Sequence, residues 1–241
     1  MEYPIVNGLD FNVFNSPEES IYYSHCLRYL VFDRLNAAQN VVEFGSGDGV
    51  PVVSAIKKSN FQGLVTGFEV NPVASEKARD LIAACGLQDR YEVIHGSFFD
   101  EASFRSEDIL ISDPPFLPAK TNRIMDPLLW GGNDGSDIYL RLIERGYDTL
   151  MLMIASYSNP LKILSAAFDS EYVVQDFLVS PMTIGEYSRE KPVWERLMEM
   201  KHAGEAFYSS THFLLAGVVL GRNPARASMA EALTNVLTAI R

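Results

Sequence analysis

The chain has 241 residues, of which 47% are hydrophobic and 21% charged, and this suits one globular α/β domain with an extension. Its net charge of −11 disfavours nucleic-acid binding, because that binding relies on Lys and Arg to neutralise phosphates. The longest apolar stretch, residues 213–220, is far shorter than the roughly 20 residues that span a membrane. Cys26 and Cys85 form no CxxC pair, and the first fifteen residues do not resemble a signal peptide. We therefore expect a soluble cytoplasmic protein with free thiols.

Signals for strands and helices alternate after an N-terminal extension and helix, residues 1–38. Ser16-Pro17-Glu18-Glu19 is typical of a helix start, so this helix should run from about residue 17 to residue 36. Further helices are expected at 51–59, 75–84, 137–145, 160–168 and 229–240. Strands are expected at 41–44, 64–70, 91–95, 108–112, 149–155, 172–179 and 213–220.

This alternation predicts a Rossmann-like, doubly wound α/β fold, with a mostly parallel seven-stranded sheet and helices on both faces. The main domain should cover residues 39–222, followed by a C-terminal helical segment, 223–241. Residues 181–211 form an insertion before the last strand, in which Val193, Trp194, Leu197 and Met198 follow helical spacing. We expect an amphipathic helix there that either caps the ligand site or packs on the sheet edge. Ligands of such sheets bind beyond the carboxyl ends of the strands, where the strand order reverses.

A glycine-rich turn follows the first strand, with glycines at Gly45, Gly47 and Gly49. Because Val50 stands where the dinucleotide fingerprint GxGxxG needs its last glycine, that fingerprint fails. An acid, Glu43, before GxGxG resembles the first motif of class I methyltransferases. The resemblance implies S-adenosylmethionine as cofactor, with the glycines against its methionyl part and ribose and with Glu43 reaching its amino group. The alternative is a tight strand–helix turn that binds no ligand.

Two later positions extend the predicted cofactor site. Glu69 ends the second strand, where a carboxylate can accept hydrogen bonds from both ribose hydroxyls; alternatively it is a capping or surface acid. Ser97 stands where the class I family usually has an aspartate that binds the adenine amino group, and a hydroxyl accepts this bond more weakly. Phe98 is expected either to stack on the adenine or to be a core aromatic.

The most specific motif is Asp113-Pro114-Pro115-Phe116, which follows the strand at 108–112. Because prolines stiffen the backbone, the Asp113 side chain and the Pro114 carbonyl would be fixed as a pair of acceptors beside the Phe116 ring. Two acceptors that hold a flat amino group favour a pyramidal nitrogen and aim its lone pair at a methyl donor, while the ring interacts with a sulfonium. We therefore interpret Asp113, Pro114 and Phe116 as catalytic residues for N-methylation. The alternative is a rigid turn without a ligand.

This motif resembles the [Asn/Asp/Ser]-Pro-Pro-[Tyr/Phe/Trp] signature of amino-methyltransferases, which act on adenine N6, guanine N2 or the glutamine amide of release factors. Trp130-Gly131-Gly132-Asn133-Asp134-Gly135 further resembles the GG-x-DG segment of release-factor glutamine methyltransferases, and Asp134 is also expected to cap the next helix. The resemblance covers residues 40–158 well. Asp113 and Phe116 depart from it, because the release-factor enzymes carry Asn and Tyr there, and their N-terminal domain is longer.

The sequence thus predicts an S-adenosylmethionine-dependent N-methyltransferase acting on a planar amide or amino nitrogen. The acidic charge favours a protein or small-molecule acceptor over nucleic acid. Two alternatives stay open: an RNA or DNA base methyltransferase, which predicts a basic strip at the site, and a cofactor-binding module without catalysis. His202 and His212 are too isolated to predict a metal site. Candidates for a basic strip, which are otherwise scattered surface charges, are Lys120, Arg123, Arg189, Lys191 and Arg196.

Overall fold

The computed structural model describes residues 13, 16–35, 39–102, 108–222 and 228–240. Within these residues, seven strands form one sheet in the order β3-β2-β1-β4-β5-β7-β6. Strand β7 is antiparallel to both of its neighbours, and the other strand pairs are parallel. The predicted doubly wound, mostly parallel sheet is confirmed. The strands are β1 Val41–Phe44, β2 Val65–Glu69, β3 Tyr91–His95, β4 Ile109–Ser112, β5 Thr149–Ala155, β6 Val173–Thr183 and β7 His212–Gly221.

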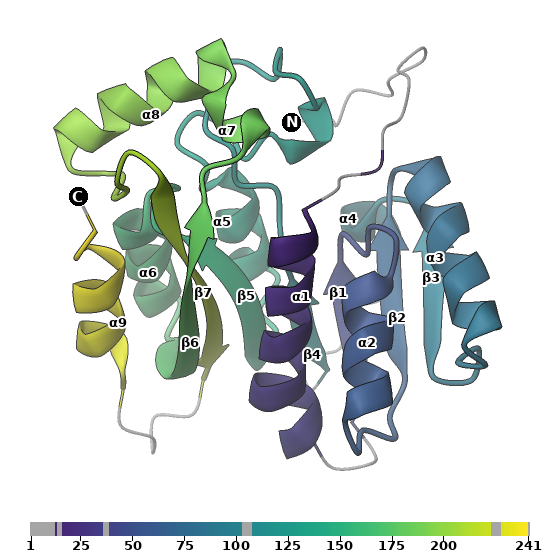
Figure 1. Ribbon diagram of the computed structural model, residues 1–241. Helices are drawn as coiled ribbons and strands as arrows, with labels where there is room; N and C mark the ends of the chain where they lie inside the picture. Colours follow the sequence, from purple (N-terminus) through teal and green to yellow (C-terminus); the bar gives the residue numbers. More distant parts are fainter. Residues whose placement is uncertain (1–12, 14–15, 36–38, 103–107, 223–227, 241) are drawn as a thin grey trace.

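The helices lie in two layers around the sheet (Figure 1). Helices α1, α2 and α3 cover one face, and α5 and α6 cover the other. In the described residues the helices are α1 Pro17–Cys26, α2 Val50–Lys58, α3 Pro72–Ala84, α4 Phe98–Glu101, α5 Asp137–Glu144, α6 Pro160–Asp169, α7 Glu186–Arg189, α8 Lys191–Ala203 and α9 Ala230–Leu237. None of them is long and apolar enough to cross a membrane.

Local sequence explains where helices α1 and α3 begin. Helix α3 begins at Pro72, three residues before the predicted start, because the Asn71 side chain accepts hydrogen bonds from the backbone N–H groups of Val73 and Ala74. The N-terminal helix begins at Pro17 as predicted, but its regular α-helical part ends at Cys26. A wider turn, Leu27–Val31, and a 3-10 turn, Phe32–Arg34, continue it. The predicted end at residue 36 lies outside the described residues.

Buried apolar residues hold these layers together. Strand β5 is buried from Leu150 to Ala155, as expected for a central strand that is covered on both faces. Helix α1 places Tyr23 and Cys26 against the sheet, and the following turn adds Leu27 and Leu30. This packing fixes the N-terminal end of α1 at the same edge of the sheet as the carboxyl ends of the parallel strands (Figure 1).

The strand order reverses between β1 and β4, which pair in parallel with Phe44 opposite Ser112. The glycine turn after β1 and the Asp113 motif after β4 therefore leave the sheet side by side. Glu69 ends β2 on the other side of β1. The topology alone thus brings the three predicted motifs to one edge, at the position where doubly wound sheets bind ligands.

The insertion before β7 differs in detail from the prediction. Strand β6 continues to Thr183, so the first three residues of the predicted insertion, 181–183, belong to the sheet. The rest contains a short helix, α7, and the predicted amphipathic helix, α8, which buries Val193, Leu197 and Met200. Both helices lie above the carboxyl edge of the sheet in Figure 1.

Candidate functional site

A cavity of about 290 Å³ opens at the carboxyl edge, where the strand order reverses. Its walls come from the glycine turn, the ends of β2 and β4, the start of α4, the first turns of α1 and the α7 segment. Of the ten predicted site residues, eight line it: Gly45, Gly47, Glu69, Ser97, Phe98, Asp113, Pro114 and Phe116. Glu43 and Gly49 are not among the lining residues.

The glycine turn presents bare backbone to the cavity. Gly45 and Gly47 have φ angles of +74° and +55°, and a Cβ built on either residue would meet no atom within 4 Å. The free space beside both residues is what a ligand that approaches the backbone requires. Gly49 has a different surrounding, because its Cβ would lie 3.1 Å from the Cβ of Ala78 on α3. Gly49 therefore serves the packing of α2 against α3, and its predicted cofactor contact stays a prediction.

Glu69 is anchored by backbone donors while it lines the cavity. Its Oε2 accepts from the N–H of Gly47 and its Oε1 from the N–H of Asn71, both at 2.8 Å. Burial raises the pKa of Glu69, and these backbone hydrogen bonds partly offset that rise. Each carboxylate oxygen has two lone pairs, so a further donor can still bind to it. The alternative of a simple helix cap is disfavoured, because Asn71 is the residue that caps α3.

Glu43 lies beneath the glycine turn, where it is 1% exposed. Its Oε2 accepts from the hydroxyl of Tyr91 at 2.6 Å, and its Oε1 accepts from the hydroxyl of Tyr23 at 3.4 Å. Burial raises the pKa of Glu43 to about 7. The residue therefore supports the turn from below and titrates in the neutral range. The predicted contact of Glu43 with the cofactor's amino group stays a prediction.

We expect Glu43→Gln to reduce the pH dependence of stability. A carboxyl whose pKa rises from 4.5 in the unfolded chain to about 7 in the folded protein stabilises the fold most below pH 4.5. That contribution is lost as pH increases through 7, and it amounts to about 3 kcal/mol. Glutamine keeps an acceptor for Tyr91 but does not titrate. Urea unfolding from pH 5 to 8 should therefore show a shallower decline in the free energy of unfolding for the variant; an unchanged slope would contradict the assignment.

Asp113 has one buried carboxyl oxygen that lacks a hydrogen-bond partner among the described residues. This oxygen is Oδ1, and Asp113 lines the cavity. Burial first, and then the charges of Glu19 and Glu43, raise the pKa of Asp113 well above its usual value. Leaving a buried polar atom unpaired is costly, so such an atom in a cavity wall is a candidate ligand contact. Phe116 also lines the cavity, and its ring centroid lies 5.7 Å from that of Tyr157.

The loop at 131–135 holds the backbone of the Asp113 motif. The carbonyl of Leu117 accepts from the N–H of Gly131 at 3.0 Å, and the carbonyl of Phe116 accepts from the hydroxyl of Ser158 at 2.9 Å. A Cβ on Gly131 would lie 2.7 Å from the Cα of Phe116, and a Cβ on Gly135 would lie 2.5 Å from the Phe116 carbonyl oxygen. The glycines of this loop therefore allow the close approach that fixes Phe116.

Asp134 does not cap helix α5 as predicted, because Ser136 occupies the N-cap position. The Asp134 carboxylate instead joins two loops. Its Oδ1 accepts from the Ser136 hydroxyl at 2.6 Å, and its Oδ2 accepts from Asn159 at 3.0 Å and from Lys162 at 2.8 Å. Burial opposes the charged form, but these hydrogen bonds outweigh it and lower the pKa of Asp134. Asp134 therefore ties the 131–135 loop to the start of α6.

We expect Gly135→Ala to impair turnover by displacing Phe116. Gly135 has a φ of +79°, so alanine adds backbone strain there as well as a clash with the Phe116 carbonyl. We expect a loss of about 1–3 kcal/mol of stability and, because the motif shifts, about a tenfold or larger loss of the methyl transfer that the sequence predicts. Gly204→Ala is the matched control, because Gly204 has a φ of +74° and open space around its Cβ. Equal activity loss in both variants would contradict the proposed support role.

Ser97 and Phe98 differ in their access to the cavity. Ser97 lies just before α4 and is partly exposed in the cavity wall. Phe98 is only 1% exposed, and its ring packs edge-on against Phe44 and Phe68 at centroid distances of 5.5 and 5.8 Å. This packing supports the core alternative for Phe98, and its stacking on adenine stays a prediction. The adjacent Phe99 lines the cavity and is less buried.

Residues from further elements line the cavity without having been predicted from the sequence. Helix α1 supplies Glu19, the segment after the Asp113 motif supplies Asp126, and α7 supplies Glu186 and Tyr187. Helix α8, which was expected to cap the site or pack on the sheet edge, contributes no lining residue. Its Arg196 donates to the carbonyl of Asn133 at 2.8 Å, so α8 braces the 131–135 loop.

The cavity is acidic. Among its described lining residues are carboxylates but no Lys, Arg or His; the carboxylates are Glu19, Asp48, Glu69, Asp113, Asp126 and Glu186. Four of the five candidates for a basic strip are engaged elsewhere: Lys120 and Arg196 with Glu199, Arg189 with the Ile184 carbonyl, and Lys191 with Glu195. None of the five candidates, Arg123 included, lines the cavity.

Part of the chain is similar in sequence to known methyltransferases. Residues 28–130 match the family model of the methyltransferase small domain, which covers less than half of the chain. The chain is 29% identical over 86 residues to the tRNA1(Val) (adenine(37)-N6)-methyltransferase of Pectobacterium carotovorum, covering 35% of each protein. It is 31% identical over 112 residues to the release factor glutamine methyltransferase of Agrobacterium fabrum, covering 43% of this chain and 38% of that protein. The chain thus spans about a third of the length of these curated relatives.

Solved structures share the fold at low sequence identity. A putative RNA methyltransferase from Pyrococcus horikoshii superimposes with a TM-score of 0.54 at 13% identity, covering 84% of this chain and 82% of the other. A geranyl diphosphate methyltransferase in complex with S-adenosylmethionine gives a TM-score of 0.53 at 14% identity, covering 85% and 86%. At these identities the likeness concerns the fold alone.

Proposed function

We propose that the protein transfers a methyl group from S-adenosylmethionine to a planar amide or amino nitrogen of a protein or small molecule. The class of enzyme and its cofactor are supported by the methyltransferase small-domain match over residues 28–130 and by the fold shared with a cofactor complex. The choice of nitrogen is our inference from the cavity. The observation that carries it concerns Asp113, which lines the cavity directly before two prolines and has a buried oxygen without a hydrogen-bond partner among the described residues.

The residues around the glycine turn fit the cofactor. The bare backbone of Gly45 and Gly47 would hold its methionyl part and ribose, and the remaining lone pairs of Glu69 would accept the ribose hydroxyls. Ser97 would accept from the adenine amino group, and Glu43 would support the turn from below. When bound, S-adenosylmethionine supplies an electrophilic methyl group on a sulfonium.

The Asp113 motif would hold the methyl acceptor. Asp113 accepts one N–H of the acceptor nitrogen, and the carbonyl of Pro114 accepts the other, so that the lone pair points away from both. The ring of Phe116 lies against the flat substrate group, held by its contacts with Tyr157 and Phe213. Positioning and fixed dipoles then lower the barrier to methyl transfer. The side chains of the Asp113 motif stay in place because the 131–135 loop fixes the backbone of this motif.

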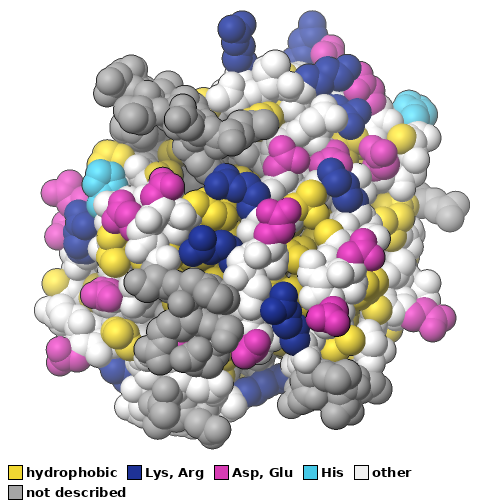
Figure 2. Space-filling model, turned by 180° about the vertical axis from the view of Figure 1, so that it is seen from behind, with side chains coloured by type: hydrophobic (Ala, Val, Ile, Leu, Met, Phe, Trp, Pro, Cys, Tyr) yellow, Lys and Arg dark blue, Asp and Glu magenta, His cyan; other side chains and the backbone are white. Residues whose placement is uncertain are grey.

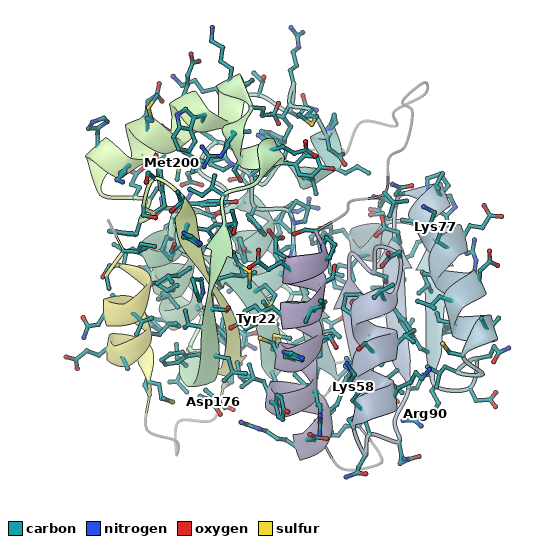
Figure 3. The ribbon with its side chains drawn as sticks, viewed as in Figure 1. Tyr22, Lys58, Lys77, Arg90, Asp176 and Met200 are labelled. Carbon is teal, nitrogen blue, oxygen red and sulfur yellow. The ribbon has the colours of Figure 1, made fainter. Side chains whose placement is uncertain are left out.

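The charge of the cavity supports a protein or small-molecule acceptor. Its described lining residues include carboxylates and no basic side chain. A phosphate backbone at this mouth would be repelled rather than steered. Basic residues occur elsewhere: Figure 3 shows Lys58 and Arg90 at the end of the molecule opposite to the glycine turn. On the face in Figure 2, basic side chains are interspersed with acidic ones.

A second candidate is methylation of a nucleic-acid base, which the partial similarity to a tRNA adenine-N6 methyltransferase favours. The same motif chemistry suits the amino group of adenine. This candidate predicts methyl acceptors that ribonuclease or deoxyribonuclease destroys, and binding that weakens steeply as salt increases. The third candidate, a cofactor-binding module, predicts affinity for S-adenosylhomocysteine without methyl transfer.

One experiment in two stages separates these candidates. Calorimetry with S-adenosylhomocysteine tests cofactor binding, and the absence of binding would refute all three candidates. Transfer of tritiated methyl groups to a desalted cell extract and to its small-molecule fraction then tests catalysis. We expect label that is sensitive to protease or that stays in the small-molecule fraction. Label that disappears with nuclease would overturn our choice of acceptor.

A further inference from the structure

We propose that Glu19, on helix α1, is a second acid of the acceptor site, which binds the amino group together with Asp113 and takes the proton that methylation releases. The proposal rests on the proposed function. Glu19 lies outside the residues that match the methyltransferase small domain, 28–130, and far in sequence from Asp113. Its role therefore depends on how α1 packs and not on the motifs.

The fold brings Glu19 to the site. Helix α1 begins at Pro17, and its first turn lies at the carboxyl edge of the sheet (Figure 1). Asp113 directly follows β4 at the same edge. Both Glu19 and Asp113 line the same cavity. Further along the helix, Tyr23 is buried and donates to Glu43, which anchors α1 against the glycine turn.

Both acids keep an oxygen without a partner. The Oε2 of Glu19 and the Oδ1 of Asp113 are each buried, and neither has a hydrogen-bond partner among the described residues. Because both residues line one cavity, their two unpaired carboxyl oxygens match the needs of a ligand with N–H donors. Glu18, the neighbouring acid on the same helix turn, is exposed instead. Water can therefore satisfy the Glu18 carboxylate, whereas the Oε2 of Glu19 in the same turn has no partner among the described residues.

The surroundings of Glu19 and Asp113 favour the protonated form of both carboxyl groups, so that the pair can share a proton. Burial raises the pKa of Glu19 to about 7, the charge of Glu18 adds to the rise, and a hydrogen bond with Ser16 opposes it. Burial and the charge of Glu19 raise the pKa of Asp113. No Lys, Arg or His is among the described lining residues of this cavity to offset the two charges. The titratable groups that act on one acid or the other, or line the same cavity, are Glu18, Tyr23, Cys26, Glu43, Asp48, Glu69, Asp126, Tyr139, Tyr157, Glu186 and Tyr187.

Methyl transfer forms one bond, breaks another and releases one proton. The nitrogen lone pair forms the new N–C bond while the S–C bond breaks, and the electron pair of that bond stays on sulfur. The methylated nitrogen then carries one proton more than the neutral product. The Glu19 carboxylate accepts this proton and later releases it to water, so the acid pair returns to its starting state. Asp113 keeps its hydrogen bond to the nitrogen throughout.

The first test needs no methyl acceptor. Protein labelled with ¹³C at its side-chain carboxyls is titrated by NMR as wild type, Glu19→Gln and Glu18→Gln. We expect the Glu19 resonance to titrate near pH 7, and Glu19→Gln to remove it and to move the Asp113 transition to lower pH. Glu18→Gln, the matched exposed control, should keep both transitions and move that of Glu19 only slightly to lower pH, because burial contributes more than the charge of Glu18 to the raised pKa of Glu19. A Glu19 resonance that titrates near pH 4.5, or an Asp113 transition unaffected by Glu19→Gln, would overturn the proposal.

The second test is the pH profile of labelled-methyl transfer to the extract fraction that accepts label. Because the acceptor of the proton must be ionised, the single-turnover rate of the wild type should rise as pH passes through about 7. Glu19→Gln should lower the rate about 10²-fold and abolish this limb, whereas Glu18→Gln should keep it. The same pH limb in wild type and Glu19→Gln would refute the role.

Calorimetry with S-adenosylhomocysteine on the same variants separates this proposal from the proposed function. If all variants bind it and the wild type transfers methyl groups while the Glu19→Gln profile is unchanged, only the role of Glu19 fails. If the wild type neither binds nor transfers, the proposed function itself fails.

Discussion

Asp113→Ala should lower the rate of methyl transfer by about 10²–10³-fold and leave the affinity for S-adenosylhomocysteine within a few-fold. The reason is that Asp113 directly follows β4, where we propose that the acceptor binds, whereas the groups proposed for the cofactor lie at or just after the ends of β1, β2 and β3. One oxygen of the removed carboxyl, Oδ1, is buried and has no hydrogen-bond partner among the described residues, so its loss breaks no hydrogen bond with them. Single-turnover assays with labelled cofactor and calorimetry measure the two quantities separately.

Asp113→Asn is the informative companion variant. Asparagine keeps a carbonyl acceptor of the same shape but cannot take part in sharing a proton with Glu19. We expect a smaller loss than with alanine, together with a changed pH profile. A fall in S-adenosylhomocysteine affinity as large as the fall in rate would contradict the assignment of Asp113 to the acceptor side.

Glu69→Ala should have the opposite signature, weakening S-adenosylhomocysteine binding by about 10²-fold. Two effects add up here. The variant loses the acceptor for the ribose hydroxyls, and it leaves the N–H groups of Gly47 and Asn71 without the carboxylate that orders the glycine turn. At saturating cofactor, the remaining methyl-transfer rate should lie within about tenfold of wild type.

The control for Glu69 is Glu76→Ala, which removes an exposed acid from α3, the helix that follows β2. It should bind S-adenosylhomocysteine like the wild type. Thermal unfolding without ligand is measured on both variants, so that a general loss of folded protein is recognised. Unchanged affinity in folded Glu69→Ala would show that this carboxylate does not hold the cofactor.

Much of the fold was accessible from the sequence because the strands of a parallel sheet are short apolar runs. Strand β3 was predicted at its observed bounds, and β5 likewise. The errors fall where tertiary contacts decide. Strand β6 extends to Thr183 because Pro181 to Thr183 pair with β7, and α4 is a single short turn without a periodic pattern of its own.

Part of the candidate site was also predictable from the sequence. Motifs that directly follow strands are brought together by the topology, so Gly45, Glu69 and Asp113 line one cavity. Gly49 and Glu43 stand in the same motif but face the packing beneath the turn, which the order of residues does not reveal. Sequence spacing identifies the loop but not the side from which a ligand approaches it.

Glu19 shows most clearly what sequence reasoning lacked. An acid in the first turn of a helix has a sufficient local explanation, because it interacts favourably with the helix dipole. Glu18 has the same local explanation and is exposed. Only the packing of α1 against the sheet separates the two residues and buries an oxygen of one of them beside the Asp113 motif. Asp134 is a similar case, because its local pattern suggested a helix cap and its partners lie in another loop.

A crystal structure of the protein with S-adenosylhomocysteine tests the central idea most directly, namely that methyl donor and flat amino group meet beside a proline-backed carboxylate. The adenosyl group should lie over the glycine turn with its ribose on Glu69, and the sulfur should point to the space bounded by Asp113, Pro114 and Phe116. A ligand bound elsewhere, or a sulfur directed away from Asp113, would contradict it.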